Sequence, residues 1–140
     1  MWIQIVATND NGDTVFASGL LDPNGDLLND KSDYVRNSSM KKDSLLVLFN
    51  GSAFRFGKEV PFFFDADAIV NHTIAPSETR TARYRIPPQL YGNTQNLHIN
   101  LKLLMRAMPP YIMRLLGHAD LISKVPIFTM EEANVDVVIK

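Results

Sequence analysis

Apolar and polar side chains alternate along the chain from residue 96 to residue 106. In an extended backbone this alternation places one set of side chains on each face, which predicts a strand buried on one face. The apolar face would hold Leu97, Ile99, Leu101, Leu103 and Met105. Pro109 and Pro110 end the pattern because proline has no N–H to donate. The helical spacing of apolar residues that follows predicts a short helix over Pro110–Leu116.

Turn signals divide the rest of the chain into further short strands. The sequence NDNGD at 9–13 follows an apolar run and predicts a β-hairpin, since Asn-Gly tolerates the positive φ of a tight turn. DPNGD at 22–26 predicts a second turn, and Asn50-Gly51 predicts another hairpin. The expected strands are 2–7, 14–18, 45–49, 53–56, 68–74, 79–86 and 96–106, with one or two short final strands within 125–128 and 135–139.

These elements predict a single all-β domain over residues 1–140. About eight short strands with a turn roughly every ten residues are typical of an immunoglobulin-like β-sandwich. A jelly roll or a partly open barrel is the alternative. The segment 29–44 is polar and has no sustained period, and we expect it to be a mobile loop.

Composition excludes several classes of protein. Fourteen basic residues stand against 15 acidic ones, without the basic stripe that nucleic acid selects. The chain has no cysteine, which excludes disulfides, thiolate zinc sites, a cysteine nucleophile and covalent attachment of haem c within it. No apolar run is long enough for a membrane span. The first residues are not a signal peptide, so the signal of an exported protein would lie elsewhere.

The candidate catalytic and metal-binding residues are scattered. His72, His98 and His118 lack the short spacing of a zinc pair and are more typical of hydrogen-bonded or surface histidines. A small hydrolase would need a pocket that joins His72 or His98 to a nucleophile, and the sequence has no nucleophile elbow. The sequence therefore does not predict an enzyme or a metal site.

Two further sets of residues leave alternatives open. The 22–26 turn offers alternating oxygen ligands but lacks the twelfth-position glutamate of a calcium loop, which favours a plain turn. Arg83 and Arg85 flank Tyr84 and could dock an acidic surface or haem propionates, although a solvated sheet face has the same pattern. Exposure of Tyr84 together with Tyr91 would instead favour a free-standing adhesion or carbohydrate-binding β-sandwich.

Three segments in order carry a family resemblance. They are WIQIVATNDNGDTVFASGLLDPNGDL at 2–27, VPFFFDADAIVNHTIAPSETRTARYRIP at 60–87 and LHINLKLLMRAMPPYIMRLLG at 97–117. Together they resemble the C-terminal β-sandwich domain of bacterial multihaem c-type cytochromes, the cytochrome c554-related group. The match consists mostly of turns and core positions, such as the tryptophan-led strand and the R-Y-R strand.

The resemblance implies a non-catalytic accessory domain of an exported, periplasmic or extracellular electron-transfer complex. The haem-attachment motifs of the family lie before this domain, so haem c would belong to a partner chain, with His72, His98 and His118 as candidate contacts in trans. The family domain also begins one strand earlier, which implies an open sheet edge that a haem-bearing chain completes. On that expectation the partner interface consists of Trp2, Ile3, Ile5, Arg83 and Arg85.

Overall fold

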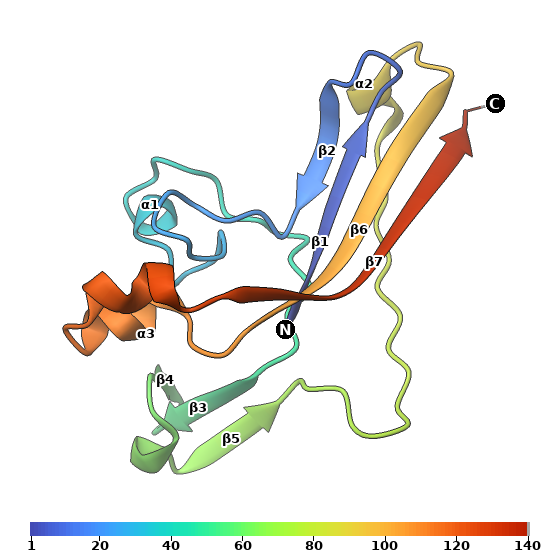
Figure 1. The fold of residues 1–140 in the computed structure, drawn as a ribbon. Coiled ribbons are helices and arrows are strands. Elements are labelled where there is room, and N and C mark those ends of the chain that lie inside the picture. The colour runs from blue at the N-terminus through green and yellow to red at the C-terminus, as the bar shows by residue number, and fades with distance from the viewer. Residues whose placement is uncertain (140) are drawn as a thin grey trace.

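The computed structural model describes residues 1–139, which form seven β-strands in two antiparallel sheets (Figure 1). The four-stranded sheet has the order β2-β1-β6-β7 and the three-stranded sheet the order β4-β3-β5. The strands are β1 (Trp2–Thr8), β2 (Thr14–Ser18), β3 (Gly51–Arg55), β4 (Lys58–Val60), β5 (Ala68–Asn71), β6 (Asn96–Arg106) and β7 (Ile127–Val138). The mostly β architecture predicted from the sequence is therefore confirmed.

Short helices connect the strands. The helical elements are α1 (Asp33–Arg36), η1 (Phe63–Asp65), α2 (Pro88–Tyr91), α3 (Pro110–Leu115) and η2 (Ala119–Lys124). The predicted helix after the two prolines is confirmed as α3, where Pro110 occupies the first turn. No helix among the described residues is long and apolar enough to cross a membrane. In Figure 1, the three-stranded sheet lies beyond one end of the four-stranded sheet, beside α3.

The β1–β2 hairpin forms where the sequence predicts it. The side-chain oxygen of Asn9 accepts hydrogen bonds from the backbone N–H groups of Asn11 and Asp13, at 3.0 and 2.9 Å. Gly12 supplies the positive φ of the turn, at 83°. On the neighbouring side, β6 pairs with β1 from Trp2↔Leu104 to Thr8↔His98. β1 is thus an interior strand.

The hydrophobic core lies on one face of the four-stranded sheet. Ile5, Ala7 and Phe16 are buried there, and Tyr84 and Ile86 pack over them. The latter two belong to a segment of residues 72–87 that follows the four-stranded sheet from β5 towards α2 (Figure 1). This segment has no strand, so the prediction of a strand over 79–86 is wrong.

The 22–26 turn anchors the segment that follows it. The Asp22 side chain accepts hydrogen bonds from the backbone N–H groups of Asn24 and Asp26 and from the hydroxyl of Ser32, which is fully buried. Ser32 also caps α1 by accepting the Val35 N–H. The 29–44 segment therefore contains a helix and a buried anchor that the sequence did not predict, and its mobility stays a prediction.

Two other predicted features are wrong. Residues 45–49 are not a hairpin strand but lie beside the start of β1, where Ile3 N–H donates to the Val47 carbonyl at 3.1 Å. β3 instead turns at Phe56-Gly57 into β4. The final strand, expected as one or two short strands, is a single strand of twelve residues, β7. Periodicity alone could not show that residues 45–49 are not a hairpin strand, because a short apolar run fits a strand and an extended loop equally well.

The expected open edge at β1 is also wrong. β1 pairs with β2 on one side and β6 on the other, and Trp2 and Ile5 are only 4% exposed. The side chains of Trp2 and Ile5 belong to the protein interior, and Ile3 is half-buried. Whether these residues contact a partner stays a prediction. The edges of the four-stranded sheet are β2 and β7.

Candidate functional site

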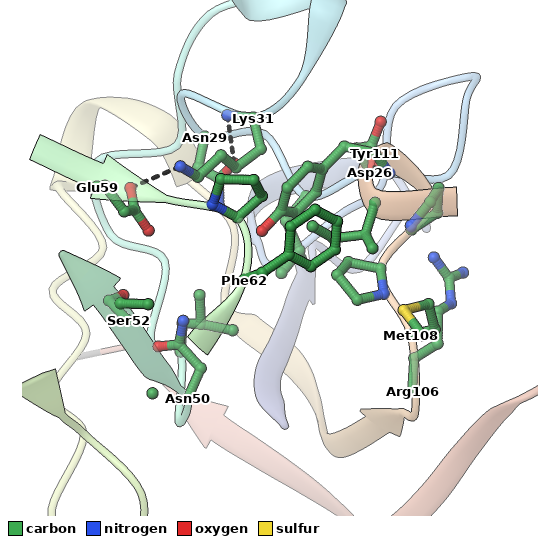
Figure 2. Close-up of a pocket in the computed structure, with 18 of the residues that line it drawn as sticks. Asp26, Asn29, Lys31, Asn50, Ser52, Glu59, Phe62, Arg106, Met108 and Tyr111 are labelled. Atoms are coloured by element: carbon green, nitrogen blue, oxygen red, sulfur yellow. Dashed lines mark hydrogen bonds and ion pairs between the residues drawn. The ribbon is translucent and has the colours of Figure 1, made fainter. Parts of the chain in front are cut away.

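A cleft of about 730 Å³ opens between β3, β4, the 21–31 segment and α3; we call it the α3 cleft. Figure 2 shows Phe62 reaching across it towards Tyr111 and Met108. Lys31 and Glu59 form an ion pair of 2.5 Å at one side. The volume lies within the range of small-molecule sites, and the walls are mostly apolar.

The wall of the α3 cleft contains a buried ion pair. Asp26, only 2% exposed, accepts a hydrogen bond from the Tyr111 N–H at 2.9 Å and another from the Arg114 guanidinium. Burial raises the pKa of Asp26, and Arg114 offsets this only in part. The pair therefore joins α3 to the 22–26 turn, which fixes the shape of the cleft.

Arg106 lines the same cleft at the end of β6. Its Nη1 donates to the Gly25 carbonyl at 2.7 Å, while its Nε is buried without a hydrogen-bond partner. Burial lowers the pKa of Arg106, against the opposing effect of Asp26. No histidine is among the described residues that line the cleft, so it does not offer the histidine and nucleophile pair that the hydrolase hypothesis needs.

The second candidate site is the outer side of β7, including its free edge; we call it the β7 surface. Every residue of β7 is exposed, and within residues 1–139 this strand pairs with β6 alone. β7 ends the strand order of this sheet, and Figure 1 shows it outside β6 over its second half, towards the C-terminus. A twelve-residue edge strand with both faces exposed is rare in a monomer, because it offers unpaired backbone groups to any other chain.

The two faces of the β7 surface differ in character. One face carries Ala133, Val135 and Val137 opposite Leu101, Ile99 and Leu97 of β6. Val135 is 46% exposed, because the core residues Tyr84 and Ile86 pack over the β1–β2 side of this sheet face. An apolar sheet face is normally buried against a second layer.

The other face of the β7 surface is polar. Glu132 accepts a hydrogen bond from Asn100 at 2.6 Å and lies 3.4 Å from Lys102. These contacts lower the pKa of Glu132, with the hydrogen bond from Asn100 as the largest cause. Asp136 lies 2.7 Å from Nδ1 of His98.

The exposed area of the molecule is large for its size. A folded 15.8-kDa monomer is expected to expose about 7,300 Å², whereas this chain exposes 9409 Å². The excess of about 2,100 Å² is larger than the roughly 800 Å² that one partner buries in an interface of standard size. The chain therefore leaves more surface uncovered than a compact monomer of its mass.

The structure does not bring the three candidate histidines together. His72 follows β5, His98 lies on the polar face of β6, and His118 precedes η2. His98 is held through Nδ1 by Asp136, and its Nε2 lies 4.0 Å from Asp10. No group of three or more metal-ligating side chains is present in the described part of the chain. Contact of these histidines with haem in trans stays a prediction.

The other candidate residues lie on the 72–87 segment. Arg83 and Arg85 are exposed and Tyr84 and Ile86 are half-buried, so exposure alternates along this segment as it does in a half-buried strand, although the segment is not a strand. Tyr84 packs edge-on against Phe16, with ring centroids 6.2 Å apart. It is therefore not free to form an exposed aromatic platform with Tyr91, which weakens the carbohydrate-binding alternative. Whether Arg83 and Arg85 contact a partner stays a prediction.

Sequence reasoning missed both surfaces. The α3 cleft joins residues far apart in the chain, and the DPNGD sequence at 22–26 predicted only a turn there. The β7 surface had a local signal, since VDVV at 135–138 alternates in an otherwise acidic segment. Comparison with protein-family models, curated proteins and solved structures finds no match for this chain.

Proposed function

We propose that this chain is a non-catalytic accessory domain that docks onto another protein. The observation that carries the proposal is the β7 surface, where an apolar sheet face and a twelve-residue strand edge are both uncovered. Covering Val135, Val137 and their neighbours would contribute about 25 cal/mol per Å² of apolar area removed from water. A partner that supplies the missing layer gains this energy.

The proposed partner is a haem-bearing multihaem cytochrome of an exported, bacterial electron-transfer complex. This part of the proposal rests on the resemblance of residues 2–27, 60–87 and 97–117 to the accessory β-sandwich of that group. Haem c in the partner would carry the electron. The residues of this chain would seat the partner and exclude water, because the burial and polarity around a haem set its potential.

The residues present fit this role better than that of a haem carrier. Without cysteine the chain cannot hold haem c covalently through a C-x-x-C-H motif, and its histidines lie on separate elements. His98, oriented by Asp136 through Nδ1, is the one histidine whose second ring nitrogen a partner's group could approach with the ring already held. Arg83 and Arg85 are exposed cations available to propionates.

We further propose that the completed fold is an immunoglobulin-like sandwich. The three-stranded sheet lies beyond the end of the four-stranded sheet (Figure 1), so the apolar face beside β7 needs its second layer from elsewhere. The partner would supply that layer.

The test is purification of the tagged chain from a host that makes multihaem cytochromes. We expect a partner that brings c-type haem absorbance in the visible spectrum. Val135→Lys should remove the partner, whereas Ile69→Lys, which changes an exposed apolar residue of β5, should retain it. A partner without haem would contradict the cytochrome assignment. A soluble, colourless monomer that binds nothing would contradict docking itself.

A further inference from the structure

We propose that β7 binds, edge to edge, an extended segment of the partner in which apolar residues alternate with lysine or arginine. The inference rests on the proposed function and specifies the chemistry of the docked segment. It depends on three observations: the direction of the backbone groups of β7, the distribution of charge along the strand, and the length of its free edge.

The backbone of β7 offers a regular row of groups to a new strand. Ile139 N–H donates to the Gln95 carbonyl of the β6 side at 2.8 Å. Because antiparallel strands alternate their hydrogen-bonding direction, odd-numbered residues back to Glu131 face β6. The N–H and C=O groups of Glu132, Asn134 and Asp136 therefore point away from the sheet. An added strand would pair with them.

The apolar face of the strand ends in an uncompensated acid. Ala133, Val135 and Val137 share this face with Glu131, whose side chain makes no hydrogen bond or ion pair with the other described residues, 1–139. Directly opposite side chains in a sheet interact, and an opposite charge contributes roughly 0.2–1 kcal/mol. A docked strand thus matches best when apolar residues face Val135 and Val137 and a cation faces Glu131.

The polar face favours the same partner. Glu132 and Asp136 share contacts with Lys102 and His98 of β6, but β7 itself carries no basic residue from 127 to 138. A basic side chain on the docked strand would meet an acidic row on this face as well.

Charge also argues against a second copy of this chain as the occupant. Two β7 strands placed edge to edge would bring six carboxylates onto neighbouring strands with no cation from either strand. Like charges on adjacent strands are destabilising. Acidic residues on an exposed edge are a known way of preventing self-association. A cationic strand meets no such repulsion.

The other edge of the sheet is a poorer site. β2 has five residues, and α2 lies against it. β7 offers twelve residues without a neighbour on its outer side within residues 1–139. Strand addition gains affinity from each main-chain hydrogen bond, so the longer edge binds more tightly.

The experiment uses the full chain and three synthetic twelve-residue peptides. The first alternates valine and lysine, the second alternates valine and glutamate, and the third has the composition of the first in scrambled order. Hydrogen exchange measured by NMR reports on each amide. We expect the valine–lysine peptide to slow exchange at Glu132, Asn134 and Asp136 by at least tenfold, and to change Ala133 and Val135 little because those amides already bond to β6.

Two pairs of variants test the mechanism. Asn134→Pro removes one outward N–H and should weaken the valine–lysine peptide at least tenfold, whereas Asn134→Ala should change its affinity less than twofold. Glu132→Lys, on the face that the lysines of the docked peptide share, should weaken that peptide and strengthen the valine–glutamate peptide. Asp120→Lys, an equal change of charge on η2, should leave both unchanged.

The outcomes separate this inference from the proposed function. Equal binding of the three peptides, protection of odd-numbered amides alone, or no binding at all would overturn the strand inference. If the haem-bearing partner still co-purifies in any of these cases, docking stands and uses another part of the sheet face. If the peptide binds as expected and no haem-bearing partner is captured, β7 is a strand-binding edge and the cytochrome assignment is lost.

Discussion

Asp26→Ala should destabilise the fold more than any other single removal of a charged side chain. Asp26 is 2% exposed, and its carboxylate accepts hydrogen bonds from the Tyr111 N–H and the Arg114 guanidinium. The truncation leaves the Tyr111 N–H unpaired and leaves Arg114 with only its longer contact to Asp33, at 3.6 Å. The α3 helix would lose its main polar link to the 22–26 turn.

The magnitude follows from the burial of each partner. Breaking a fully buried ion pair by removing one member costs about 3–5 kcal/mol. The Arg114 side chain is 24% exposed and lies 3.6 Å from Asp33, so water and a second carboxylate partly stabilise the cation that remains. We therefore expect the free energy of unfolding to fall by about 3 kcal/mol, at the lower end of that range. Asp30→Ala is the control, because the Asp30–Lys42 pair is exposed and should contribute at most about 1 kcal/mol.

Urea unfolding followed by fluorescence measures this change, because Trp2 is the only tryptophan and is buried. Arg114→Met in the Asp26→Ala background should recover part of the loss, since it removes a part-buried cation that has lost its main partner. The resulting double-mutant cycle should give a coupling of at least about 1 kcal/mol. A loss below about 1 kcal/mol for Asp26→Ala, similar to the control, would show that the pair does not hold α3 in place.

Three other substitutions test the four-stranded sheet. Hydrogen bonds from the start of β6 hold the pKa of Asp10 well below its usual value. The ionised Asp10 side chain therefore stabilises the folded state fully above about pH 4, and this stabilisation is lost as the pH falls through the pKa of Asp10 in the folded protein. Asp10→Asn should lower the thermal midpoint at pH 7, and the gap from wild type should close towards pH 2; a gap independent of pH would contradict this. Gly19→Ala places a Cβ 2.1 Å from the Ile3 carbonyl oxygen and should cost at least about 3 kcal/mol in urea unfolding. Gly12→Ala, which also has a positive φ but open space, should cost about 1–2 kcal/mol, and equal losses would exclude the clash as the cause. Trp2→Phe leaves the Gly19 carbonyl without its 3.0 Å donor and should cost about 1–3 kcal/mol, measured by circular dichroism; no loss would show that water replaces the bond.

The sequence predicted those parts of the fold that depend on local chemistry. The β1–β2 hairpin follows from Asn-Gly, β6 from its alternation, and α3 from the proline pair and the helical spacing behind it. The alternating exposure of Arg83 and Tyr84 was also predictable. The strand expected over 79–86 does not form, because alternation indicates which side chains face inward but does not show whether another strand lies alongside to pair with the backbone.

The remaining features depend on contacts between distant segments. β1 was expected at an edge, yet β6, about one hundred residues away, covers its second side. The α3 cleft needs the 22–26 turn, β4 and α3 to meet, which no local pattern encodes. β7 was expected as one or two short strands, because acidic residues interrupt its apolar residues. The same interruption gives the edge its charge.

The placement of β1 has a consequence for how the chain folds during synthesis. Trp2 pairs with Leu104, so the β6-facing hydrogen-bonding groups of β1 have no partner strand until the ribosome has added more than one hundred further residues. At about 5–20 residues per second that interval lasts roughly 5–20 s. Pairings this distant in sequence slow folding because chain entropy is lost before the contacts form. The nascent hairpin must therefore survive alone, and chaperone dependence of the newly made chain is the expected result.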